Sequence, residues 1–128
     1  MKPEFAAVIN CMDGRVQDPV NKWMKAYTGA TYIDVITEAG PDKIMSSTAT
    51  ASRLILKRLL VSRDKHHSKQ IALVAHHDCA GNPGSKEHHL DHLQQSAKIM
   101  ATWHLEMTIH LLWVDENWEV ELISSINA

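Results

Sequence analysis

Two short motifs hold the residues best suited to chemistry. Cys11-Met12-Asp13-Gly14-Arg15 follows a buried apolar run, and His76-His77-Asp78-Cys79 follows a second such run much further along the chain. Together the motifs supply two thiols and at least one imidazole, and zinc prefers soft sulfur and borderline nitrogen donors. Three protein donors leave the fourth tetrahedral position open, which is the catalytic rather than the structural arrangement. The pooled donors therefore suit an open zinc site.

Asp13 and Arg15 add a charged pair beside the first thiol. They lie two positions apart, so on an extended segment both side chains can point to the same side as Cys11. A guanidinium can hold a carboxylate bidentately and keep it ionised and aimed. The pair is therefore either a catalytic dyad or a structural ion pair that braces the turn.

The elements that position these motifs follow from the apolar pattern. Short runs rich in β-branched residues, bounded by Gly, Pro and polar residues, predict strands at Phe5–Asn10, Thr31–Thr37, Gln70–Ala75, Ile109–Val114 and Trp118–Ile123. Helices are predicted from an Asp18-Pro19 cap to Tyr27, from a Ser46-Ser47-Thr48 cap to Ser62, and from Lys86 to Met107. In the second helix, the apolar stripe Leu54–Leu60 is expected in the core.

Strands that alternate with helices predict an α/β fold. We expect a three-layer structure with a mostly parallel β-sheet of strand order about 2-1-3-4, an antiparallel C-terminal edge strand and flanking helices. In such a sheet, ligands bind beyond the carboxyl ends of the strands, where the strand order reverses. With this order the first and third strands are neighbours there, and the loops that begin at Cys11 and His76 converge.

The motifs and their surroundings resemble the β-class carbonic anhydrases. Val8–Val16 resembles the first zinc block of that family, and Ala75–Gly81 resembles the second. Glu38-Ala39-Gly40 stands where the family has an Asn-Ala-Gly turn, and His110–Leu122 resembles its last strand and hairpin. Either motif alone is weak, but both in order and in the expected strand context are specific.

The resemblance implies a function and a set of site residues. Cys11, His76 and Cys79 would be the ligands of one Zn²⁺, and Asp13 with Arg15 would be the catalytic dyad. The implied reaction is the reversible hydration of carbon dioxide to bicarbonate by a zinc-bound hydroxide. The resemblance also implies a homodimer or a higher homo-oligomer.

Composition sets the remaining bounds. A chain of 128 residues with 45% apolar and 22% charged residues is one ordinary domain, which we place at residues 1–128. The net charge of −2 gives no reason to expect nucleic acid or an anionic membrane as a partner. Apolar runs such as Phe5–Ile9 are too short to span a bilayer, and the first residues do not resemble a signal peptide. We therefore expect a cytoplasmic location.

Several other side chains have ordinary explanations. His88 and His92 have the i, i+4 spacing of a helical metal site, but a solvated helix face is the preferred interpretation because no third ligand is near in sequence. Asp78 is expected to brace its loop, and His77 to point away from His76. Trp103, Trp113 and Trp118 are expected in the core or at a subunit interface.

Two other functions remain open at this stage. The first is a related zinc hydrolase of carbonyl sulfide or carbon disulfide, and the second is a non-catalytic zinc-binding domain. A thiol-based phosphatase is excluded because it needs Arg six positions after the nucleophilic Cys. Gln17 follows Cys11 at that spacing, and Ser85 follows Cys79.

Overall fold

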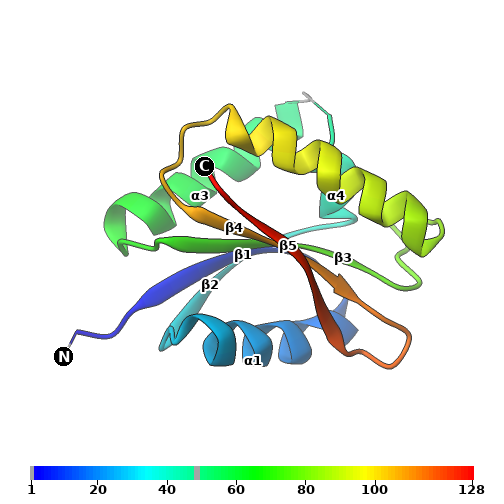
Figure 1. Cartoon of the computed structure of the whole chain (residues 1–128), viewed down its shortest axis with the longest axis horizontal. Coiled ribbons are helices and arrows are strands. Elements are labelled where there is room, and N and C mark those ends of the chain that lie inside the picture. The colour runs from blue at the N-terminus through cyan, green and yellow to red at the C-terminus, as the bar shows by residue number, and fades with distance from the viewer. Residues whose placement is uncertain (1, 48–49) are drawn as a thin grey trace.

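The computed structural model describes residues 2–47 and 50–128 of the chain. Its centre is a five-stranded sheet with the order β2-β1-β3-β4-β5 (Figure 1). The strands are β1 (Phe5–Cys11), β2 (Tyr32–Glu38), β3 (Gln70–His76), β4 (Thr108–Val114) and β5 (Val120–Asn127). The first four are parallel, and β5 pairs antiparallel with β4. The predicted fold class and strand order are confirmed.

Helices cover both faces of the sheet. The helix α1 (Gln17–Thr28) lies against one face, and α3 (Thr50–Lys65) and α4 (Lys86–Ala101) lie against the other (Figure 1). The strands follow the two-residue alternation of side chains, so Val8 on β1 packs into the apolar cluster under α1 while Ile9 packs into the cluster under α3 and α4. Strands buried on both faces explain why β1 and β3 are nearly continuous apolar runs.

Helix boundaries were the weakest part of the sequence prediction. The predicted Asp18 cap is wrong, because a 3₁₀ turn, η1 (Gly14–Val16), leads directly into α1, whose N-cap is Val16 with no side-chain hydrogen bond. The short helix α2 (Pro41–Met45) was not predicted. Of the proposed Ser46-Ser47-Thr48 cap, Ser46 instead ends α2 as its C-cap, and Thr48 lies outside the described residues. Leu54 was expected in the core but is 55% exposed.

The C-terminal third also differs in detail. Helix α4 ends at Ala101 rather than Met107, and His104 and Glu106 in the following loop have left-handed φ angles of 51° and 57°. Strand β5 is longer than predicted, because it pairs with β4 along its whole length, from Val120 opposite Val114 to Asn127 opposite Thr108. Within the described residues, no helix has both the length and the apolar character needed to cross a bilayer.

Candidate metal centre

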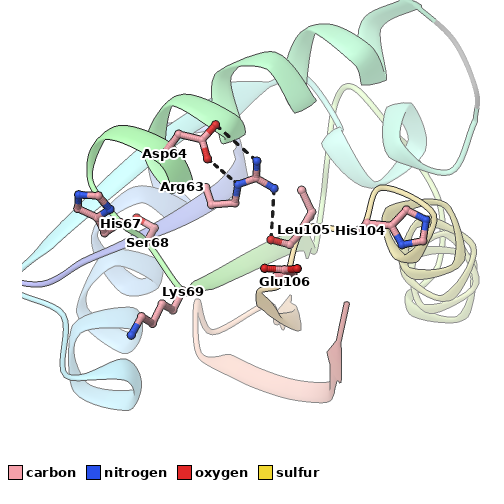
Figure 2. A pocket seen from close by; sticks show the side chains of 8 residues that line it. All are labelled: Arg63, Asp64, His67, Ser68, Lys69, His104, Leu105 and Glu106. Atoms are coloured by element: carbon pink, nitrogen blue, oxygen red, sulfur yellow. Dashed lines mark hydrogen bonds and ion pairs between the residues drawn. The ribbon is translucent and has the colours of Figure 1, made fainter.

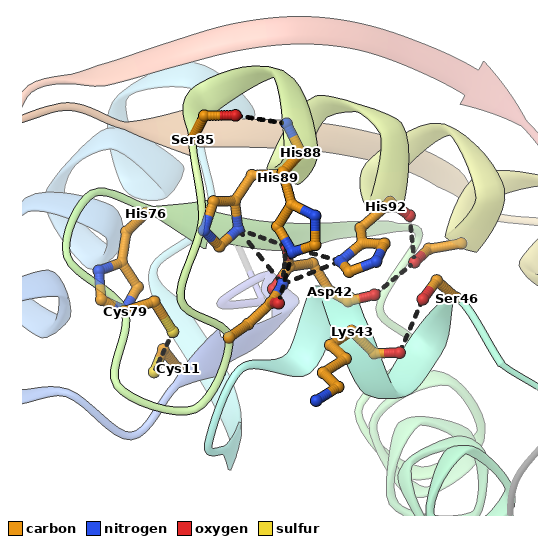
Figure 3. Close-up of polar contacts among 12 residues, drawn as sticks. Cys11, Asp42, Lys43, Ser46, His76, Cys79, Ser85, His88, His89 and His92 are labelled. Carbon is orange, nitrogen blue, oxygen red and sulfur yellow. Dashed lines mark hydrogen bonds and ion pairs between the residues drawn. The ribbon is translucent and has the colours of Figure 1, made fainter.

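The two motifs meet at the carboxyl ends of neighbouring strands. Cys11 is the last residue of β1 and His76 is the last residue of β3, and these strands are paired in the middle of the sheet. Cys79 follows on the loop after β3. The donor atoms of Cys11, His76 and Cys79 all lie within 4.8 Å of one another, and all three residues are buried (Figure 3). Elsewhere in residues 2–47 and 50–128, no three donor atoms of His, Cys, Asp or Glu all lie within 4.8 Å of one another.

The geometry of this cluster fits a tetrahedral metal ion. The sulfur atoms of Cys11 and Cys79 are 3.9 Å apart. Zinc–sulfur bonds of about 2.3 Å at tetrahedral angles place two sulfurs about 3.8 Å apart. The chemistry of the donor set, two thiols and an imidazole, is that of zinc.

The imidazole of His76 is also oriented so that it can bind a metal ion. Its Nδ1 donates a hydrogen bond of 2.7 Å to the backbone carbonyl of His77. This leaves the lone pair on Nε2, which is buried and has no hydrogen-bond partner among the described residues. A backbone carbonyl on the far nitrogen is a common way to fix the tautomer of a metal-binding histidine. The orphaned nitrogen is therefore suited to a metal.

The protonation of the two thiols is strongly coupled. The contact with Cys79 is the main reason that the pKa of Cys11 falls to about 4, and contacts with His76 and nearby backbone N–H groups lower it further against the effect of burial. The same contact is the main cause that raises the pKa of Cys79 above its usual value, and burial raises it further. Burial alone would lower the pKa of His76, but its contacts with Cys11 and His77 raise the pKa overall. A bound cation would hold both sulfurs as thiolates.

Asp13 and Arg15 form a two-point ion pair at the edge of the cluster. Arg15 Nη2 lies 2.7 Å from Asp13 Oδ2, and Arg15 Nε lies 3.1 Å from Asp13 Oδ1. The guanidinium is the main cause that lowers the pKa of Asp13 to about 2, so this carboxylate is ionised at neutral pH. The backbone N–H of Asp13 faces the sulfur of Cys11 and lowers its pKa. The pair therefore lies beside the Cys-His-Cys cluster, although Arg15 belongs to the 3₁₀ turn η1 and not to the extended segment expected from the sequence.

Arg15 is held from two further sides. Its Nη1 lies 3.2 Å from Asp78 Oδ2, and its Nη2 donates to the Asp78 carbonyl at 3.1 Å. Asp78 thus braces the loop, as predicted. The guanidinium carbon also lies 4.5 Å from the ring centroid of Trp118, which belongs to the β4–β5 turn. Trp118 was expected in the core or at an interface, and its position over Arg15 was not foreseen.

Two other contributors were missed by the sequence interpretation. Gln17 donates to the carbonyl of Cys11 at 2.7 Å and to that of Asp13 at 3.0 Å, which ties the first motif to the start of α1. Gly40 has a left-handed φ of 66°, and a Cβ there would lie 2.8 Å from the carbonyl carbon of Gly81. The Glu38-Ala39-Gly40 turn had been matched to the family. Its contact with Gly81 could not be seen in the sequence, because the two glycines are far apart along the chain.

The remaining histidines behave differently from one another. His77 is exposed, as expected, although its carbonyl holds His76. His88 is exposed, as a solvated helix face requires, whereas His92 is half-buried, and both bond to the side chain of Asn82, at 2.8 and 2.9 Å. The two residues therefore belong to a polar network around Asn82 that the sequence interpretation did not include.

A cavity of about 550 Å³ lies at the opposite end of the sheet, beside the residues that precede β3 and β4 (Figure 2). Arg63 in this cavity is bonded to Asp64 and to the carbonyl of Leu105. Lys69 and Glu106 also line it, so acidic and basic side chains are balanced in number. Neither the metal centre nor the Asp13–Arg15 pair opens into this cavity.

Comparison with known proteins agrees with this architecture. A family model described as putative carbonic anhydrase matches residues 1–124. The fold is similar to a structure of tetrameric β-carbonic anhydrases from Sordaria macrospora, with a TM-score of 0.55 and 12% identity over 97% of this chain and 82% of that one. It is also similar to the β-carbonic anhydrase CafA of Aspergillus fumigatus, with a TM-score of 0.50 and 16% identity over 95% and 76% of the two chains. Among curated proteins, none matches.

The five-stranded sheet, its flanking helices and the Cys-His-Cys cluster define a β-carbonic-anhydrase-like protein. The chain belongs to the putative carbonic anhydrase family whose model spans nearly its whole length.

Proposed function

We propose that this protein is a zinc-dependent carbonic anhydrase that hydrates carbon dioxide reversibly to bicarbonate. The observation that carries the proposal is the buried cluster of Cys11, His76 and Cys79, whose imidazole Nε2 has no other partner among the described residues. In this proposal the three residues hold one Zn²⁺. The metal supplies Lewis acidity, which lowers the pKa of a water molecule to about 7.

The charged residues beside the cluster have separate tasks in this proposal. Asp13 is the acceptor that orients the attacking nucleophile, because its carboxylate stays ionised far below neutral pH. Arg15 positions Asp13 through two hydrogen bonds, one to each carboxylate oxygen, which restrict the carboxylate to one orientation. Asp78 and Trp118 hold Arg15 in turn.

A homo-oligomer and a cytoplasmic location complete the proposal. The Sordaria enzymes are tetrameric, and β2 is an edge strand here with exposed Tyr32 and Val35. An exposed apolar edge strand is a common site of association between copies.

Stopped-flow hydration of carbon dioxide by zinc-loaded protein, followed with a pH indicator, tests the function. We expect turnover that disappears when the metal is chelated and returns with Zn²⁺. Turnover of carbonyl sulfide or carbon disulfide without hydration of carbon dioxide would instead identify the related hydrolase. Tight zinc binding without turnover of any of the three gases would identify a non-catalytic domain.

A further inference from the structure

A cluster of polar side chains lies behind the metal centre and has no task in the proposed reaction. Asp42 of α2, Asn82 of the loop after Cys79, and His89 of α4 are all almost completely buried. In Figure 3, His88, His89 and His92 project from α4 toward Asp42, and the Cys11, His76 and Cys79 group lies to one side of them. The cluster joins α2 to two segments much further along the chain, since Asn82 and His89 lie 40 and 47 residues beyond Asp42.

Asn82 occupies the centre of this cluster, and its side-chain amide bonds to Asp42, His88 and His92. Its Nδ2 lies 2.9 Å from Asp42 Oδ2 and 2.9 Å from His92 Nδ1, and its Oδ1 lies 2.8 Å from His88 Nε2. His89 Nδ1 donates to Asp42 Oδ2 at 2.6 Å. An amide has two N–H donors and an acceptor oxygen, so Asn82 satisfies all three contacts at once. A carboxylate at position 82 could not donate to Asp42.

Burial of this cluster is costly for the fold. Asp42 Oδ1 and His89 Nε2 are buried and have no hydrogen-bond partner among the described residues. Buried ion pairs seldom stabilise a protein more than apolar side chains of similar volume would. Stability alone therefore does not account for the cluster.

The backbone connects the cluster to both sulfurs. The N–H groups of Gly81 and Asn82 face the sulfur of Cys79, and the N–H of Gly40 faces that of Cys11. Gly40 and Gly81 are packed so closely that neither has room for a Cβ. The two turns that supply the N–H groups therefore touch at this point. Asp42 follows the first turn, and its bond to Asn82 fastens it to the second.

We propose that Asp42 and Asn82 form a clamp that positions the two sulfur-binding turns and so sets how tightly the centre holds zinc. The clamp rests on the proposed zinc site. It acts through the backbone: with the Asp42–Asn82 bond in place, the N–H donors stay aimed at the sulfurs and the distance between the thiolates stays right for the metal. Loss of such supporting contacts commonly costs about 10- to 100-fold in metal affinity.

Competition with a chromophoric zinc chelator measures both the affinity for Zn²⁺ and its rate of release. Asn82→Asp places two carboxylates together, and we expect weaker binding by about 10- to 100-fold with faster release. The exchanged double variant Asp42→Asn/Asn82→Asp restores one donor facing one acceptor and should recover part of the affinity, because the contacts with His89 and His92 are altered as well. Asn82→Ser is a milder single change, for use if Asn82→Asp does not fold. Circular dichroism confirms that each variant is folded.

Ser62→Ala is the matched control. Ser62 is also a buried polar residue, and it bonds to Asp34 and Ser68, which do not contact the metal centre. This variant should lose stability without a change in zinc affinity. Parent-like affinity and release in both Asn82→Asp and Asn82→Ser would overturn the clamp while leaving the zinc site intact. A parent protein that binds no zinc would overturn the clamp and the proposed function together.

Discussion

The guanidinium of Arg15 is stacked on the ring of Trp118, 4.5 Å from its centroid, and this contact joins the first motif to the β4–β5 turn. Trp118 is placed there by a left-handed φ of 59°, an unfavourable conformation for a bulky residue. Asp115 stabilises the turn, since its carboxylate accepts hydrogen bonds from the N–H groups of Asn117 and Glu119. Strain of this kind is often found where a side chain must be aimed at a site.

The first prediction concerns this stacking. Trp118→Leu removes the aromatic face, so Arg15 should be less well fixed and kcat should fall about two- to fivefold, the range of a partly exposed cation–π contact. KM should change little, because Trp118 acts through Arg15. Trp118→Phe keeps an aromatic face and should retain most of the turnover. Equal kcat in the parent and Trp118→Leu, measured by stopped flow, would contradict a positioning role.

The second prediction separates Asp13 from Arg15. Asp13→Asn should retain zinc while kcat falls by about 100-fold or more, because an amide is not an anionic acceptor. Arg15→Ala should also lower kcat, but it frees the carboxylate to approach the metal. X-ray absorption should then report an additional oxygen donor in Arg15→Ala and none in Asp13→Asn. If the pair only braces the turn, both variants melt at lower temperature and keep full activity per folded molecule.

The third prediction is a pH dependence of stability that arises from His110. Burial lowers the pKa of His110 below its usual value of 6.5, and its ring bonds to Ser125 and Gln70. The unfolded chain therefore protonates His110 more readily than the folded chain does. The contribution of neutral His110 to the free energy of unfolding should be complete above about pH 6.5 and should be lost as the pH falls below that value. His110→Phe should reduce this slope while keeping the contacts with Tyr27. Urea unfolding at pH 5.5 and 7.5, in one metal state, measures the difference. An unchanged slope would show that other groups cause it.

The fourth prediction is a homo-oligomer in solution. Tyr32 and Val35 are exposed on the edge strand β2. Light scattering should give a mass of a dimer or more at micromolar concentration, and Val35→Lys should lower it by adding charge to the edge. A monomer in the parent protein would contradict this.

The sequence was sufficient for the strand order and for the meeting of the two motifs. Strand periodicity predicted β1 and β3, and the geometry of parallel sheets brought Cys11 and His76 together. The same reasoning could not find Asn82 or Trp118, because their importance depends on contacts with Asp42 and Arg15 across the fold. No local pattern marks such contacts. Helix ends were predicted poorly for a related reason: η1 rather than a capping side chain starts α1.

The central claim is that Cys11, His76 and Cys79 bind zinc, and metal analysis of the purified protein tests it most directly. Protein prepared without chelator should contain about one zinc ion per chain, since two thiolates and an imidazole form a complete open site. Cys79→Ser should lose most of this zinc, because a serine hydroxyl is a poor, protonated donor at neutral pH. Full zinc content in Cys79→Ser, or none in the parent after loading with Zn²⁺, would contradict the account.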